Sequence, residues 1–214
     1  MVSMSATKSA FACATDGFVE LVGQIQDPQW HLPGLGVWDV RALVGHSARA
    51  LVTLETYLNN PLSEGSLIES PAAYFRLMLG DGSDPKQRQI QDEAIAERGR
   101  EAGRDLGANP IEMISSLASR VLVLVEGVKD DRLLTIPAGV ISFANYLPTR
   151  TFELSVHSLD IAQALQLELP VVLTDAIAAS LELAAQIGAL RSDAPELLRL
   201  LTGRRTQGGS LSVL

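Results

Sequence analysis

The stretch Arg150-Thr-Phe-Glu-Leu-Ser-Val-His-Ser-Leu-Asp160 places two metal-binding residue types, Glu153 and His157, four positions apart in a segment with helical periodicity. At that spacing the two side chains leave the same face of a helix, one turn apart. His46 ends a second helical pattern, Trp38-Asp-Val-Arg-Ala-Leu-Val-Gly-His46. Two helices packed side by side would bring the three groups together. Zinc accepts imidazole and carboxylate ligands, and a catalytic site typically takes three of them and leaves one position open.

Four helical patterns, starting near residues 5, 39, 110 and 149, carry the apolar stripes from which a core can be built. We therefore predict an all-α fold, a four-helix bundle with extra helices. Metal sites in bundles are built from inward side chains of facing helices, which agrees with the ligands suggested above. Residues 1–168 are predicted to form this bundle, and residues 169–214 a short C-terminal helical extension packed on it.

The segments between these helices are less regular. Residues 86–106 are rich in Gln, Glu, Arg and Ala, which indicates a mostly solvated helix that contributes little to the core. Residues 130–147 contain Pro137 and Gly139 and are expected to form an irregular crossover, partly extended. Residues 210–214 alternate in polarity, which predicts a short terminal strand.

Composition excludes several classes of partner. The 214 residues include 25 acidic and 17 basic side chains, for a net charge of −8, which argues against binding to nucleic acid or to anionic membranes. The single cysteine, Cys13, cannot form an internal disulfide, and its place on an apolar helix face indicates an inert core residue. With no signal peptide or membrane span recognised, we expect a cytoplasmic protein. The abundant apolar helical surface favours a homodimer.

Other polar residues near the motifs have both structural and functional interpretations. Asp160 is placed for either a hydrogen bond to His157 or solvent exposure. Arg150 is expected to pair with Glu153, or otherwise to meet an anionic ligand. Asp39 is predicted to cap the second helix, with Trp38 packing at its start. His31, in a loop of prolines and glycines, is expected to be a surface residue.

Together the two motifs, residues 37–46 and 150–161, resemble the mycothiol-dependent maleylpyruvate isomerase family of the DinB-like metal-binding superfamily. The similarity extends over most of the chain, including the Leu-Leu-Arg-Leu-Leu-Thr-Gly-Arg-Arg205 run. It implies a DinB-like four-helix bundle that binds a divalent metal, usually zinc, through His46, Glu153 and His157. Members are thiol-dependent isomerases or S-transferases that use mycothiol, the low-molecular-weight thiol of actinobacteria.

The resemblance also implies a reaction. A metal with an open position binds the thiol sulfur and yields a thiolate, which attacks a small electrophilic substrate. The part of the chain after the bundle is shorter than the C-terminal domain of the isomerase, where a basic residue assists. Arg204 and Arg205 are the candidates for that catalytic role here.

Two other functions remain open at this point. A metal-dependent hydrolase would carry water in the open position and would need a further carboxylate as base, for which Asp160 is the only obvious candidate. A non-catalytic module of the same fold would bind metal without thiol-dependent turnover.

Overall fold

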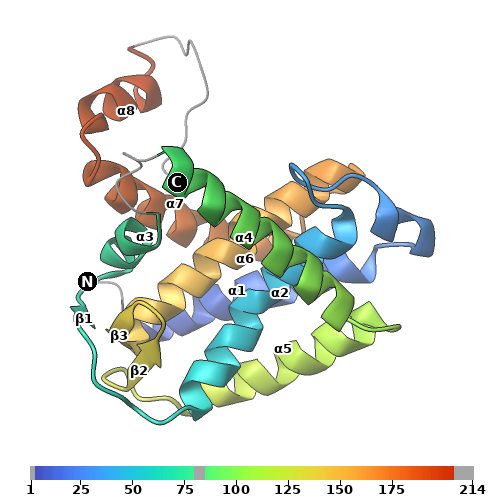
Figure 1. Ribbon diagram of the computed structural model, residues 1–214, viewed down its shortest axis with the longest axis horizontal. Coiled ribbons are helices and arrows are strands. Elements are labelled where there is room, and N and C mark those ends of the chain that lie inside the picture. Colours follow the sequence, from blue (N-terminus) through green and yellow to red (C-terminus); the bar gives the residue numbers. More distant parts are fainter. Residues whose placement is uncertain (1–2, 80–84, 205–214) are drawn as a thin grey trace.

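The computed structural model describes residues 3–79 and 85–204, and most of them lie in helices (Figure 1). The helices in chain order are α1 (Met4–Gly23), η1 (Asp27–His31), α2 (Val40–Asn59), α3 (Pro71–Leu79), α4 (Pro85–Asp105), α5 (Pro110–Gly127), α6 (Phe143–Leu165), η2 (Val171–Leu173), α7 (Thr174–Ala189) and α8 (Ala194–Leu201). The strands are β1 (Leu67–Ile68), β2 (Leu133–Ile136) and β3 (Gly139–Ser142).

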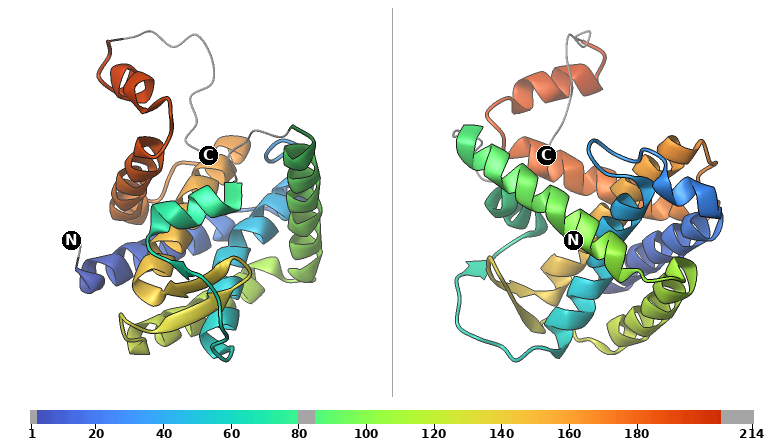
Figure 2. Two further views of the ribbon diagram at one scale, coloured as in Figure 1. Left: turned by 60° about the vertical axis from the view of Figure 1, so that its left-hand side comes forward. Right: turned by 45° about the vertical axis from the view of Figure 1, so that its right-hand side comes forward.

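The core is a bundle of α1, α2, α5 and α6, the four helices that the apolar stripes predict (Figures 1 and 2). α6 packs against both α1 and α2, and α5 packs against both of these in turn. Fully buried side chains from each helix meet in one apolar cluster, among them Phe18, Leu43, Ile114 and Leu154. The predicted mostly helical bundle is confirmed.

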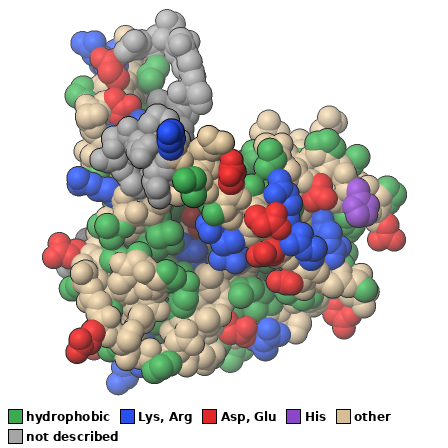
Figure 3. All heavy atoms as spheres, in the orientation of Figure 1, with side chains coloured by type: hydrophobic (Ala, Val, Ile, Leu, Met, Phe, Trp, Pro, Cys, Tyr) green, Lys and Arg blue, Asp and Glu red, His purple; other side chains and the backbone are tan. Residues whose placement is uncertain are grey.

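α4 packs along α2 in much closer contact than its polar sequence suggests. The contact is made through glycine: a Cβ on Gly45 of α2 would collide with the backbone of Gly103 in α4. The outer face of α4 is charged, with Glu97 bound to Arg100 and Arg104, and Figure 3 shows basic and acidic side chains interspersed there. The prediction of a solvated helix therefore holds for the outer face alone, because the inner face approaches α2 with almost no side chain between them.

A three-stranded sheet, in the order β1-β3-β2, covers one end of the bundle. β2 and β3 form an antiparallel hairpin in which Ile136 pairs with Gly139, and β1 adds in parallel to β3. Gly139 has a φ of +139°, and a Cβ there would meet the carbonyl oxygen of Ser66, so glycine is required at this turn. The segment expected to run partly extended is thus a hairpin.

α6 begins at Phe143, before Pro148 rather than after it. The Ser142 side chain caps the helix by accepting a hydrogen bond from the Asn145 amide, and the buried Tyr146 and Leu147 hold the first turns in place. Pro148 is therefore accommodated inside a helix that is already started. The consequence is that Arg150, Glu153 and His157 lie in the middle of a long helix and not near its end.

The C-terminal part continues from the bundle through η2 and α7, which pack on α1 and α6. Leu183 and Ile187 of α7 belong to the main apolar core, whereas α8 buries no residue (Figure 2). The segment Val171–Ala189 has the length and hydropathy of a membrane span, but such a single segment is also typical of a core helix. The strand predicted for residues 210–214 lies outside the described residues, and the domain boundary after residue 168 stays a prediction.

Candidate metal centre

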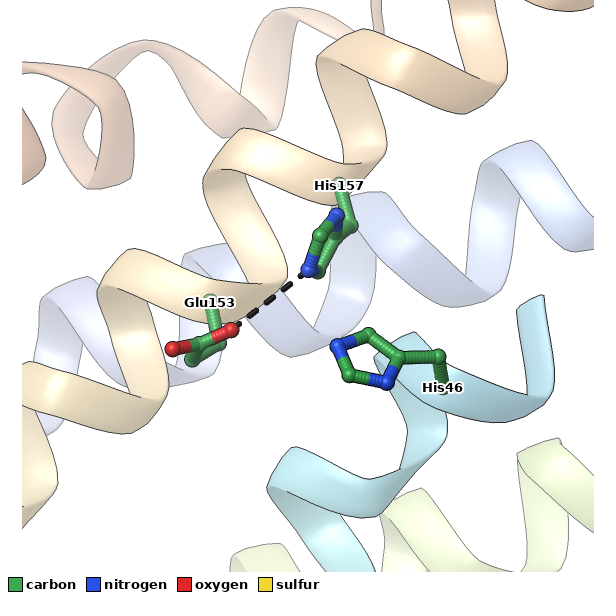
Figure 4. A group of neighbouring side chains, drawn as sticks. All are labelled: His46, Glu153 and His157. Carbon is green, nitrogen blue, oxygen red and sulfur yellow. Dashed lines mark ion pairs between the residues drawn. The ribbon is translucent and has the colours of Figure 1, made fainter. Parts of the chain in front are cut away.

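The three predicted ligands, His46, Glu153 and His157, come together between α2 and α6 (Figure 4). One donor atom from each lies within 4.8 Å of the others. His157 Nε2 is 3.4 Å from Glu153 Oε2, and the imidazoles of His46 and His157 meet edge to face with ring centroids 4.9 Å apart. The side chains are partly buried, with 13% of His157 and 27% of Glu153 exposed. The group is compact enough to hold one ion and remains reachable from solvent.

α2 holds His46 in place through its N-terminal residues. Asp39 caps the helix, as predicted, by accepting a hydrogen bond from the Ala42 amide at 2.7 Å. Trp38 lies obliquely against the His46 ring, with centroids 4.5 Å apart, and its indole N–H donates to the Ala96 carbonyl of α4. The position of His46 therefore depends on α4 as well as on α2.

One ring nitrogen of His46 faces Glu153 and His157 (Figure 4). The Nδ1 atom of His46 is buried and has no hydrogen-bond partner in the described structure. Burial lowers the pKa of His46 to about 4, and the neighbouring positive charges, His157 foremost, act in the same direction. The imidazole is neutral at pH 7. Neutral imidazole is the form that binds metal ions.

His157 is oriented by Asp160, whose Oδ2 accepts a hydrogen bond from Nδ1 at 3.0 Å. Burial opposes the charged form of His157, but hydrogen bonds to Asp160 and Glu153 outweigh it and raise its pKa to about 9. With Nδ1 bound to Asp160, Nε2 is the nitrogen left to face Glu153. Carboxylate–histidine pairs of this kind fix the tautomer and raise the basicity of a ligating imidazole.

Glu153 is held as a carboxylate. Burial would raise its pKa, but the hydrogen bond from His157 and the charge of Arg150 together lower it. Two nitrogen donors and one carboxylate oxygen match the ligand set that borderline metal ions accept. The raised pKa of His157 and the lowered pKa of Glu153 favour an imidazolium beside a carboxylate, with 3.4 Å between Nε2 and Oε2.

The sequence profile described as the mycothiol maleylpyruvate isomerase N-terminal domain matches residues 11–162. This range includes all three candidate ligands. The chain belongs to this family. None of the curated proteins and none of the solved structures compared with the chain matches it.

Membership in the mycothiol maleylpyruvate isomerase N-terminal domain family supports a mycothiol-related, metal-dependent function for the chain at a coarse level. The family region ends within α6, before η2, α7 and α8. The two arginines predicted to be catalytic thus lie outside the matched range. Arg204 is exposed just after α8, and Arg205 lies outside the described residues. Their catalytic role stays a prediction.

The predicted Arg150–Glu153 ion pair does not form. The Arg150 guanidinium instead donates to the hydroxyls of Thr149 and Tyr74, each at 3.0 Å. Its guanidinium also lies over an aromatic ring, with the Tyr146 ring centroid 4.7 Å away. His31 is exposed, as expected, and Cys13 is partly buried on α1 with burial raising its thiol pKa.

Two components of the site are not predicted from the sequence. α4 reaches the site through the hydrogen bond from Trp38, and the tyrosines around Arg150 come from three separate helices. A signal for α4 does exist, since Gly99 and Gly103 are four residues apart and so share a face of that helix. The tyrosine cluster leaves no comparable signal, because its members are far apart in the sequence.

Proposed function

We propose that the chain is a metal-dependent, mycothiol-using S-transferase or isomerase that acts on a small electrophilic substrate. The observation that carries this proposal is the compact His46, Glu153 and His157 group inside the region matched by the family profile. The metal proposed for this group is zinc. When bound, a divalent ion of this kind lowers the pKa of a coordinated thiol so that the thiolate is available at neutral pH.

The residues at the proposed metal site have different roles. His46 supplies a neutral donor because its surroundings disfavour protonation. Asp160 orients His157, and Glu153 contributes the single negative charge among the three donors. One negative charge does not neutralise a divalent ion, so this donor set favours an anionic thiolate over a neutral thiol as the exogenous ligand.

The hydrolase alternative receives no specific support. It requires a carboxylate that is free to act as a base toward water. Asp160 is engaged with His157 Nδ1, and Glu153 is one of the three proposed ligands. The non-catalytic alternative predicts metal binding without turnover, which the experiment below separates from the proposal.

The test compares the full-length parent protein with His157→Ala and with His31→Ala. His31 is a matched control because it is exposed and lies on η1, away from the candidate ligands. Each protein is analysed for metal content, exchanged with cobalt and titrated with mycothiol under reducing conditions. We expect one equivalent of metal in the parent and in His31→Ala, lost in His157→Ala, and a sulfur-to-cobalt absorption band on addition of mycothiol.

Three results would count against the proposal in different ways. Metal binding without a thiol band would favour the hydrolase or the non-catalytic module. A thiol band with neither consumption of mycothiol nor mycothiol-dependent isomerisation of any electrophile would favour the non-catalytic module. Equal metal content in the parent and His157→Ala would show that the three residues are not the ligands.

A further inference from the structure

α8 has an apolar stripe that the chain itself does not bury. Ala194, Leu197, Leu198 and Leu201 follow the i, i+3, i+4, i+7 pattern of a helix face that packs against a neighbour. No residue of α8 is buried, and Leu198 and Leu201 are 63% and 67% exposed. Its main contacts are with α7, and it stands away from the bundle (Figure 2). A helix of eight residues has little stability in isolation, so the stripe indicates a packing partner beyond the described residues.

α7 carries apolar side chains on two different faces. The inner face, which includes Leu183, belongs to the core. Ala178, Leu181 and Ala185 share an outer face and are exposed, and the exposed fraction of Leu181 is 65%. Only 33% of the apolar segment Val171–Ala189 is buried. The small alanines on either side of Leu181 allow another helix to approach closely.

The charges beside the two stripes have opposite signs. α7 contains no lysine or arginine and carries Asp175 and Glu182 next to its outer face, where neither forms a salt bridge with a described residue. α8 and the turn after it carry the exposed Arg199 and Arg204. Arg199 approaches Glu196 of its own helix only to 3.9 Å. Contact between α8 and the α7 of a neighbouring molecule would bring the unlike charges together.

A second copy of the chain fits these features better than a membrane does. Helices that lie on anionic membranes carry lysine and arginine beside their apolar stripe, whereas α7 carries acidic residues and the chain has a net charge of −8. A second copy offers both an apolar helix with acidic residues and an apolar helix with arginines. About a two-fold axis each of these would meet its complement twice, so the surface is complementary to itself.

We propose that the chain forms a homodimer in which α8 of each copy packs against α7 of the other. The α7–α8 face is made of Ala178, Leu181, Ala185, Leu198 and Leu201. Dimerisation buries the stripes that a single chain leaves in solvent, and the hydrophobic effect favours it for that reason. The face lies outside residues 11–162, the region that the family profile matches, and its pairing requires neither metal nor thiol.

The test measures the mass of the full chain by sedimentation velocity and light scattering over a range of concentrations. We expect the parent to be a dimer, with twice the 22.9 kDa of one chain, at micromolar concentration. Leu181→Glu and Leu198→Glu should each weaken dimerisation about a hundredfold or more, because a carboxylate would be buried in an apolar contact. Val123→Glu is the matched control, since Val123 lies on α5 and is 76% exposed, and it should dimerise as the parent does.

A charge reversal tests the pairing of α8 with the partner's α7. Arg199→Glu would place an acid near Asp175 and Glu182 of the other copy and should weaken dimerisation about tenfold. Arg132→Glu changes the net charge by the same amount at an exposed arginine outside the face and should leave the affinity unchanged. Equal effects of the two reversals would overturn this pairing.

Two further results would overturn the inference. A parent that stays monomeric at every concentration would do so, and binding of this monomer to phosphatidylglycerol vesicles would then assign the face to a membrane. A dimer that persists in both Leu181→Glu and Leu198→Glu would place the interface elsewhere. Both leucines are more than half exposed in one chain, so the variants should fold, which far-UV circular dichroism and thermal melting check. Metal content and the cobalt–mycothiol band report on the proposed function independently of the mass.

Discussion

Gly99 of α4 lies directly against the indole of Trp38, so that a Cβ at this position would come within 2.5 Å of the ring. Trp38 in turn contacts the His46 imidazole and donates its N–H to Ala96. The packing of α4 and the position of one candidate ligand are therefore coupled through a single aromatic side chain.

Gly99→Ala should displace Trp38 and with it His46. Overpacking of this kind costs about 1–3 kcal/mol of the free energy of unfolding. We expect both lower stability and weaker metal binding, measured by denaturant titration and by competition with a chromogenic chelator. Gly23→Ala is the matched control, since nothing lies within 4 Å of a Cβ there and alanine is the better helix former. Unchanged metal affinity in Gly99→Ala would show that the contact does not position His46.

Asp160→Ala should weaken metal binding about 10- to 100-fold, because a carboxylate partner orients a ligating imidazole and raises its basicity. Asp160→Asn should lie between the parent and the alanine variant, since the amide oxygen can still accept from Nδ1. The measurement is again chelator competition. Asp131→Ala, at an exposed position, should leave the affinity unchanged. Equal affinities in all four proteins would place Asp160 outside the metal-binding apparatus.

Metal affinity should rise with pH up to about pH 9. The pKa of His157 is raised to about 9, so a proton must leave this group before its nitrogen can bind an ion. His46 contributes no such dependence above neutral pH, since its pKa is lowered to about 4. Calorimetry in two buffers of different ionisation enthalpy should detect about one proton released per ion near pH 7. A release of no proton would mean that His157 is already neutral in the metal-free protein.

The metal-free protein should be most stable near pH 6.5. His46 has a folded pKa below its ordinary value of 6.5. Its contribution to the free energy of unfolding is therefore present above pH 6.5 and is lost as the pH falls toward 4. His157 has a folded pKa above 6.5, so its contribution is present below pH 6.5 and is lost as the pH rises toward 9. Denaturant titrations across this range should show the free energy of unfolding falling on both the acid and the alkaline side of pH 6.5, and His157→Gln should reduce the fall on the alkaline side. An equal alkaline fall in His157→Gln would assign it to another group.

The sequence predicts the parts of the fold that depend on local periodicity. The stripes of α1, α2, α5 and α6 are regular enough to define the bundle, and the i, i+4 spacing of Glu153 and His157 needs only a helix to bring them together. His46 could be added because its own helix is strongly patterned. These features are encoded within single segments of the chain.

The features that sequence reasoning misses depend on how segments meet. The β1–β3 pairing joins residues far apart in the chain, and the first helical turns of α6 form despite Pro148 because Ser142 caps the helix and β3 leads directly into it. The prediction of an Arg150–Glu153 ion pair rests on spacing alone, whereas the guanidinium contacts tyrosines that include residues of other helices. Such competition for one side chain is decided by tertiary packing, which a single segment does not contain.

The placement of His46 on α2 and of Glu153 and His157 on α6 has a consequence for folding. An ion bound by all three would act as a reversible cross-link across a loop that contains α3, α4, α5 and the hairpin. Because the complete site exists only in the folded chain, binding of the ion would stabilise the folded state by mass action, unlike a disulfide, and to a degree set by metal supply. The lifetime of the folded protein in the cell would then follow the concentration of available metal, independently of any reaction at the site.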